Sequence, residues 1–179
     1  MNEKSVFHLI SDITEREGVS CVLIGGFAVN YYKVVRQTAD VDFLILKNDF
    51  DKIIGLLEKA GYKRDFVQEN FVQLKSSKIS LLDVDFMFVE IDTLAKILKE
   101  SQEIEIARRN FHVPSLEHLI ALKLHSIKYN PKLRLIRDLP DIINLIKMNE
   151  LNFKDKKFQE LCRKFGTDEI YEKILEALE

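Results

Sequence analysis

The sequence lacks the features that mark membrane, secreted or disulfide-bonded proteins. No apolar run among the 179 residues reaches the length that crosses a bilayer. The first residues also lack the uninterrupted apolar core of a signal peptide. The two cysteines, Cys21 and Cys162, lie far apart without metal-binding spacing, so each is expected to be a small buried apolar residue. We therefore expect a protein of the reducing cytoplasm without membrane association.

The chain also has little net charge and no repeated or low-complexity segment. A formal net charge of -2 excludes a strongly basic nucleic-acid binder by bulk charge, although it allows a local basic patch. The length and the 46% content of hydrophobic residues suit one domain, or one domain with a small helical appendage. We expect residues 1–113 to form an α/β core, and residues 114–179 to form a C-terminal helical region packed on that core.

The stretch from Val22 to Leu46 shows a strand, a glycine pair, a helix and a second strand. Its first residues, Val22-Leu23-Ile24, are a short apolar run typical of a buried strand. Gly25 and Gly26 follow, and they allow the backbone to turn sharply and to approach a ligand closely. The next helix directs free N–H groups and a positive dipole end at that ligand, which favours an anion such as phosphate.

Asp40 and Asp42 open the second strand of this stretch and are expected to share one of its faces. Two neighbouring carboxylates repel each other unless a cation sits between them. A hard divalent ion with oxygen ligands, most simply Mg2+, is the natural occupant. A phosphate-binding turn beside a carboxylate pair outlines a nucleoside-triphosphate site. The ordinary alternatives are a plain strand-to-helix turn and a solvated strand edge.

A third carboxylate is predicted in residues 79–89, whose β-branched and aromatic content is typical of a strand. Asp83 and Asp85 would lie on one face of that strand. A carboxylate inside so apolar a strand is costly to bury unpaired, which favours a metal or a wet cleft. The alternative is that both aspartates face solvent on a half-exposed strand.

Gly25-Gly26, followed by Arg36-x-Thr38-x-Asp40-x-Asp42, resembles the signature of the nucleotidyltransferase superfamily with the DNA polymerase β-type fold. Within that superfamily, the chain is similar to the small bacterial group around the AbiEii-type toxins. The resemblance implies an α/β (α+β) fold with a mixed β-sheet flanked by helices and a C-terminal helical region. It favours Asp85 over Asp83 as the third carboxylate, because an aspartate followed by an apolar run is the usual setting in these proteins.

A second block, Val113–His125 followed by Arg137-Asp-Leu-Pro-Asp-Ile, also resembles this group. In the group, a helical lysine and a basic-acidic helix start face the nucleotide. The resemblance therefore implies that Lys123 contacts phosphates, that Arg137 and Asp138 line the site, and that Asp141 stabilises the helix start or orients Lys123. By the residues alone, a lysine that covers apolar surface and aspartates that interact with a helix dipole are equally ordinary interpretations.

The implied activity is metal-dependent transfer of a nucleoside monophosphate from a nucleoside triphosphate to an acceptor hydroxyl, with release of pyrophosphate. Asp40, Asp42 and Asp85 are the implied catalytic residues and ligands of Mg2+ or Mn2+. The implied nucleotide-binding residues are Gly25, Gly26, Arg36, Thr38, Lys123, Arg137 and Asp138. The candidate partners are a nucleoside-triphosphate substrate, an RNA or protein acceptor, and a cognate antitoxin in a toxin-like role.

Two alternatives stay open: a small-molecule nucleotidyltransferase of the antibiotic-modifying kind, and a nucleotide-binding protein that has lost catalysis. A basic open groove would favour an RNA acceptor, whereas a closed acidic pocket would favour a cationic aminoglycoside. Positive charge is dense in the C-terminal region, where it predicts either a patch for a polyanion such as RNA or a solvated helical face. The residues concerned are Lys128, Lys132, Arg134, Arg137, Lys154, Lys156, Lys157, Arg163 and Lys164.

Hydrophobic periodicity, turn residues and capping residues predict the remaining elements. Helices are expected over residues 3–17 with Gly18 at the end, from Asn48 to Ala60 with Gly61 at the end, over 93–100, and from Ser115. After a turn at Asn130-Pro131, a further helix is expected from near Asp138, with Pro140 in its first turn. Two last helices are expected over 155–165 and 168–178, separated by Gly166, with Thr167 as the cap of the second. Further strands are expected within residues 62–75 and just before Pro114.

Overall fold

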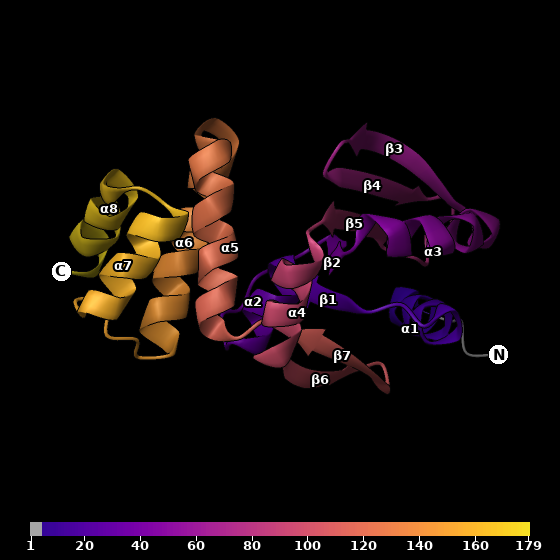
Figure 1. Cartoon of the computed structure of the whole chain (residues 1–179), viewed down its shortest axis with the longest axis horizontal. Coiled ribbons are helices and arrows are strands. Elements are labelled where there is room, and N and C mark those ends of the chain that lie inside the picture. The colour runs from indigo at the N-terminus through magenta and orange to yellow at the C-terminus, as the bar shows by residue number, and fades with distance from the viewer. Residues whose placement is uncertain (1–4) are drawn as a thin grey trace. The chain divides into compact units, whose positions relative to one another are not determined.

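The computed structural model describes residues 5–179 (Figure 1), which divide into two compact units. The first unit contains the chain up to Ala28 together with Gln37–Ser115, and the second contains Val29–Arg36 together with Leu116–Glu179. The chain passes from one unit to the other within helix α2 (Gly25–Tyr31). The end of α2 and the loop after it therefore belong with the C-terminal helices.

A seven-stranded mixed sheet forms the centre of the first unit in the described part of the chain. Its strand order is β3-β4-β5-β2-β1-β7-β6. The pairs β2–β5 and β1–β7 are parallel, and the other neighbouring pairs are antiparallel. The strands are β1 (Cys21–Ile24), β2 (Asp40–Ile45), β3 (Tyr62–Gln68), β4 (Phe71–Ser76), β5 (Asp83–Phe88), β6 (Gln102–Ile106) and β7 (Arg109–Val113).

Helices α1 (Val6–Glu17) and α3 (Lys47–Ala60) cover one face of this sheet. The Phe50 ring of α3 lies 5.2 Å from the Phe86 ring of β5, and the Phe7 ring of α1 lies 5.6 Å from the Phe111 ring of β7. Helix α4 (Ile91–Lys99) also belongs to this unit. Because alternate residues of a strand point to opposite faces, burial of Phe86 under α3 leaves Asp85 on the other face of the sheet.

The second unit contains helices α5 (Leu116–Tyr129), α6 (Pro131–Met148), α7 (Lys156–Phe165) and α8 (Asp168–Leu178). Its apolar centre comes from all four helices, with fully buried side chains that include Leu124, Leu145, Cys162 and Ile174. The Thr167 hydroxyl accepts a hydrogen bond from the Ile170 N–H at 3.3 Å and caps α8. No helix within residues 5–179 combines the length and apolar character needed to span a bilayer.

Several predictions of the elements are confirmed. The chain is a mixed α/β structure with helices on the sheet and a helical C-terminal region. Gly18 and Gly61 end α1 and α3 in the left-handed conformation, with φ of 61° and 111°. The boundary at Gly166 between the last two helices and the cap at Thr167 are also correct. The first two residues of the helix predicted over 3–17 lie outside the described residues.

Other boundaries were predicted wrongly. Helix α6 begins at Pro131, and Pro140 lies inside it rather than in its first turn. Proline suits the first helical position, so Asn130-Pro131 begins this helix instead of forming a separate turn. The N-cap of α3 is Leu46 rather than Asn48. Strand β5 begins at Asp83, so the strand predicted from residue 79 is too long, and β6 was not predicted.

Candidate active site

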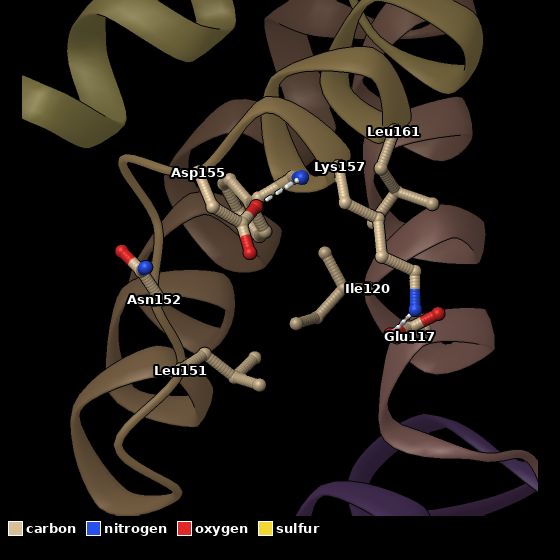
Figure 2. Close-up of a pocket in the computed structure, with 8 residues that line it drawn as sticks. Glu117, Ile120, Leu151, Asn152, Asp155, Lys157 and Leu161 are labelled. Atoms are coloured by element: carbon tan, nitrogen blue, oxygen red, sulfur yellow. Dashed lines mark hydrogen bonds and ion pairs between the residues drawn. The ribbon is translucent and has the colours of Figure 1, made fainter.

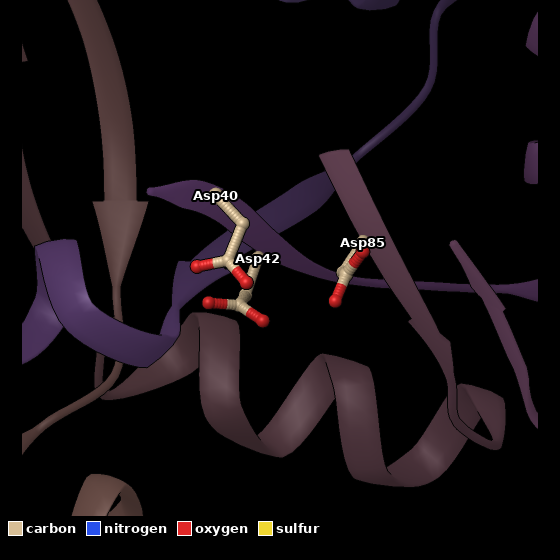
Figure 3. A group of neighbouring side chains, drawn as sticks. All are labelled: Asp40, Asp42 and Asp85. Carbon is tan, nitrogen blue, oxygen red and sulfur yellow. The ribbon is translucent and has the colours of Figure 1, made fainter. Parts of the chain in front are cut away.

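Three aspartate side chains meet on the sheet face opposite α1 and α3, where strands β2 and β5 lie side by side (Figure 3). Asp42 pairs with Asp85 in the parallel register of these strands, and Asp40 precedes Asp42 by two residues on the same face. One carboxylate oxygen from each of the three lies within 4.8 Å of the others. The structure therefore brings together all three residues predicted as metal ligands.

Asp85 is the most buried member of this acidic triad, which comprises Asp40, Asp42 and Asp85. The residue is 8% exposed, and its Oδ1 is a buried oxygen without a hydrogen-bond partner. Burial, followed by the negative charges of Asp42 and Asp40, raises the pKa of the Asp85 carboxyl to about 7. An unpartnered buried carboxylate oxygen is costly, so this group is suited to receive a proton or a cation.

The glycine pair lies directly against the triad. Gly25 has a φ of 62°, a backbone conformation that residues other than glycine rarely adopt. The Asp42 carboxylate occupies the position that a Cβ on Gly25 would take. A Cβ on Gly26 would come 2.7 Å from the Thr38 Cβ. Each glycine thus makes room for a neighbouring predicted site residue. The role of the pair toward a phosphate stays a prediction.

Thr38 and Gln73 hold two of the carboxylates. The Thr38 hydroxyl donates to Asp40 Oδ1 at 3.1 Å and lies 3.0 Å from the Asp40 carbonyl oxygen. Gln73 on β4 lies opposite Asp85 in the sheet, and its Nε2 donates to Asp85 Oδ2 at 3.4 Å. This hydrogen bond lowers the pKa of Asp85 and so opposes the effect of burial.

Asp83 has a different partner. Its Oδ1 accepts a hydrogen bond from the Ser76 N–H at 2.9 Å. Asp83 lies opposite Asp40 in the β2–β5 register, yet it is outside the group of carboxylates within 4.8 Å of one another. The geometry therefore separates the two aspartates that the sequence left as alternatives, and Asp85 is the one beside Asp42.

The chemistry of the triad fits a divalent cation. Carboxylate oxygens are the ligands that Mg2+ and Mn2+ prefer, and the three side chains converge from two rigid strands. A bound cation would also give Asp85 Oδ1 the partner that it lacks. The triad therefore has the donor atoms and the spacing of a metal site, and one of its buried oxygens has no hydrogen-bond partner. It also lies beside a tight glycine turn.

Comparison with known proteins identifies the kind of enzyme. A family model described as "Uncharacterised nucleotidyltransferase" matches residues 8–179. The chain belongs to this family of nucleotidyltransferases. A comparison with curated proteins found no match. The predicted superfamily is therefore confirmed, together with the prediction that the protein is an enzyme transferring nucleotidyl groups.

Solved structures show the same fold. The antibiotic-resistance factor ANT(2'')-Ia is 14% identical, with a TM-score of 0.64 over 94% of this chain and 92% of the other. The lincosamide antibiotic adenylyltransferase LnuA is 20% identical, with a TM-score of 0.55 over 78% and 93% of the two chains. An antigenic nucleotidyltransferase-like protein from Paracoccidioides brasiliensis is 17% identical, with a TM-score of 0.58 over 97% and 90%. The nucleotidyltransferase fold predicted for this chain is thus confirmed.

The remaining predicted site residues lie in the second unit, where four of them form a buried ion network. Lys123 of α5 is 6% exposed, and its Nζ lies 2.8 Å from Asp138 Oδ1 and 2.7 Å from Asp141 Oδ2. Arg36 Nη1 pairs with the same Asp141 oxygen at 2.5 Å. Arg134 Nη1 also lies 4.0 Å from Asp138 Oδ2, so three cations surround the two carboxylates. Lys123 is therefore an ion-paired buried side chain rather than one that only covers apolar surface.

The loop that carries Arg36 is fixed by Asn30. The Asn30 side chain accepts from the Arg36 N–H at 2.8 Å and donates to the Arg36 carbonyl at 3.0 Å, closing the segment between them. Arg137, the last predicted nucleotide-binding residue, is exposed on α6. Binding of nucleotide by Arg36, Lys123, Arg137 and Asp138 stays a prediction.

Much of the basic charge in the C-terminal helices is paired with acidic side chains. Lys157 pairs with Glu117 at 2.6 Å, Lys154 with Glu179 at 2.8 Å, and Arg163 with Asp168 at 2.9 Å. These exposed pairs reduce the local positive potential that a polyanion would meet. The solvated helical face is thus the better interpretation for this part of the predicted patch.

A small cavity in the second unit is lined by Ile120, Leu151, Phe158 and Leu161 with polar groups at its rim (Figure 2). Figure 2 shows the Glu117–Lys157 ion pair and the hydrogen bond from the Phe158 N–H to Asp155 that caps α7. The cavity has a volume of about 80 Å³, which is far below the several hundred Å³ of a nucleotide-sized pocket. The cavity contains none of the predicted site residues.

Sequence reasoning missed two contacts of the site residues. It did not foresee Gln73, whose hydrogen bond to Asp85 depends on the register of β4 against β5. It also did not foresee the Arg36–Asp141 ion pair, which joins residues 105 positions apart. The one available signal was a polar residue at an alternating position of a strand, as in Phe71-Val72-Gln73-Leu74, and that pattern is common on half-exposed strands.

Proposed function

We propose that this nucleotidyltransferase is metal-dependent and transfers a nucleoside monophosphate to a hydroxyl of a macromolecular acceptor. The acidic triad is the observation that carries the proposal. Its carboxylates converge within 4.8 Å, and the most buried one has an oxygen without a partner. Asp40, Asp42 and Asp85 would hold a divalent cation, which would supply positive charge to neutralise the triphosphate and the transferring phosphoryl group.

In the proposed reaction, Asp85 receives the proton of the acceptor hydroxyl. The hydroxyl oxygen then forms a bond to the α-phosphorus of the triphosphate. The bond between that phosphorus and the oxygen bridging to the β-phosphate breaks, and its electron pair leaves with pyrophosphate. Thr38 keeps the Asp40 carboxylate in place, and Gln73 does the same for Asp85. The glycine pair lets α2 begin close enough for Asp42 to fit beneath it.

The position of the triad supports a large acceptor. Asp40 and Asp42 are partly exposed, and Gln73 and Phe66 on the same sheet face are partly exposed and exposed, so a molecule that extends beyond the triad has side chains to contact there. The relatives of similar fold named above include antibiotic-modifying enzymes, and a small-molecule acceptor is the result that would replace our proposal. A toxin-like role with a cognate antitoxin stays a prediction from the resemblance, as does nucleotide binding by Arg36, Lys123, Arg137 and Asp138.

Transfer can be tested with each of the four α-labelled nucleoside triphosphates, added with Mg2+ or Mn2+ to total bacterial RNA and protein. We expect label on a discrete macromolecular band, lost on addition of EDTA and lost in Asp42→Asn. Asp83→Asn is the matched control for Asp85→Asn, because both residues lie on β5 and on the same face of it. We expect Asp85→Asn to abolish transfer and Asp83→Asn to retain it.

Two results would refute the proposal. Equal loss of transfer in Asp83→Asn and Asp85→Asn would remove the assignment of Asp85 as the third carboxylate. Label that appears only on small molecules would replace the macromolecular acceptor with a small one.

Nucleotide binding by Arg137 is tested in the same assay, in which Arg137→Ala should raise the KM for the triphosphate.

A further inference from the structure

We propose that the open face of strands β5, β4 and β3 binds the 3′ end of a single-stranded RNA, which is the acceptor. This inference rests on the proposed function, and it adds the class of acceptor and the surface that holds it. The surface comprises Met87 on β5, Phe71, Gln73 and Lys75 on β4, and Lys63 and Phe66 on β3; we call it the acceptor surface.

The register of the strands places this surface beside the triad. Gln73 lies opposite Asp85 across β4 and β5, and Phe66 lies opposite Gln73 across β3 and β4. Residues that pair across neighbouring strands point to the same face of the sheet. Strands lie about 4.8 Å apart, so Phe66 is about 10 Å from Asp85, with Gln73 between them. An acceptor whose hydroxyl reaches Asp85 therefore lies along these side chains.

The acceptor surface carries aromatic rings that are at least partly exposed. Phe66 is 49% exposed, and Phe71, Gln73 and Met87 are partly exposed. Val72 and Leu74 of β4 point to the opposite face of the sheet, and they are only 2% and 0% exposed. The Phe66 and Phe71 rings lie 6.5 Å apart and form a small aromatic platform. Exposed aromatic side chains on the face that bears the triad indicate a surface for ligand contact.

The chemistry of this platform suits unpaired nucleobases. Aromatic side chains on an open sheet face stack bases in several single-strand RNA-binding modules, and the side-chain amide of a glutamine can hydrogen-bond a base edge. Lys63 and Lys75 lie opposite each other on the same face and provide positive charge for the phosphates. Lys75 pairs with Asp65 at 2.7 Å, but the two side chains are 57% and 40% exposed, so this ion pair is weak.

The experiment compares two exposed residues that are neighbours on β3 and point to opposite faces. Phe66 belongs to the acceptor surface, and Val67, which is 56% exposed, points to the other side. The probe is a short single-stranded RNA of mixed sequence with fluorescein at its 5′ end, which leaves the 3′ hydroxyl free. Binding is measured by fluorescence anisotropy, and transfer to the same RNA is measured with an α-labelled nucleoside triphosphate.

We expect Phe66→Ala to weaken RNA binding and to raise the KM for RNA about tenfold, as for the loss of one base-stacking contact. The KM for the triphosphate should be unchanged. Val67→Ala should change every constant less than about twofold, because its side chain is not on the acceptor surface. Phe66→Tyr keeps the ring and should retain RNA binding, which distinguishes stacking from a structural role.

Equal effects of Phe66→Ala and Val67→Ala would overturn this inference, as would an effect on the triphosphate KM alone. Label on protein that depends on Phe66, without label on RNA, would assign the surface to a protein acceptor and overturn the RNA proposal. If RNA binding depends on Phe66 but the wild-type enzyme labels neither RNA nor protein, the RNA-binding surface is supported and the proposed function fails. RNA with a 3′-deoxy end should bind without accepting label.

Discussion

Replacing Asp85 with asparagine should make the metal-free protein more stable while it removes activity. In the absence of a cation, the Asp85 carboxylate is 8% exposed and has a buried oxygen without a partner. Burial and the charges of Asp42 and Asp40 raise its pKa to about 7. Asparagine has nearly the same shape and no charge, so the variant avoids the cost of ionising this group inside the fold.

The sign and size follow from proton linkage. The ordinary pKa of 3.8 rises to about 7 in the folded protein, so the folded state holds this proton more tightly than the unfolded state. The free energy of unfolding of the wild type therefore falls as pH rises from about 4 to about 7, and stays low above that. The shift corresponds to about 4 kcal/mol at most, and we expect about 1–3 kcal/mol because water screens the partly exposed Asp40 and Asp42.

Urea unfolding in EDTA measures this difference between the wild type and Asp85→Asn. We expect the variant to be more stable by about 1–3 kcal/mol near pH 8, with a gap that shrinks toward pH 5. Addition of Mg2+ or Mn2+ should make the wild type the more stable of the two proteins. A cation that binds the folded state stabilises it, and the variant lacks one of the carboxylate ligands for that cation.

Two outcomes would refute this reasoning. A variant less stable than the wild type near pH 8 in EDTA would show that the buried Asp85 carboxylate is not destabilising. A cation that stabilises both proteins equally would show that Asp85 is not part of its binding site. Asp83→Asn serves as the control, since the Asp83 carboxylate has the Ser76 N–H as a hydrogen-bond donor.

Three further substitutions or reagents test other parts of the structure. Gly25→Ala should destabilise the protein and abolish transfer, because its Cβ would overlap the carboxylate of a triad residue, whereas Gly55→Ala on α3 has open space and should stabilise by about 0.5–1 kcal/mol in urea unfolding. Lys123→Met should lower the free energy of unfolding by about 3 kcal/mol or more, because it leaves two buried carboxylates with one fewer cation. Lys128 is exposed, so Lys128→Met should change the free energy of unfolding by no more than about 0.5 kcal/mol. Cys162 is fully buried and burial raises its pKa to about 12, so a thiol reagent should label it only after denaturation; rapid labelling of the folded protein would contradict this packing.

The local features of the site could be predicted because they depend on short-range rules. The alternation of a strand places Asp40 and Asp42 on one face, wherever that strand lies in the sheet. A glycine pair after an apolar run indicates a tight turn, and Gly18 and Gly61 end their helices by the same backbone property. The start of α6 was missed because Pro140 was interpreted as a first-turn residue, and tertiary packing maintains the helix through it.

The sequence by itself determined the kind of chemistry: a carboxylate pair on a strand, a turn with two glycines, and a further strand that carries Asp83 and Asp85. Only the tertiary structure decided which side chains are neighbours. The parallel register of β2 and β5 sets Asp85 beside Asp42, and the antiparallel register of β4 brings Gln73 to Asp85. Strand order and register depend on how distant segments bury their apolar faces together, and local residue patterns carry little of that information.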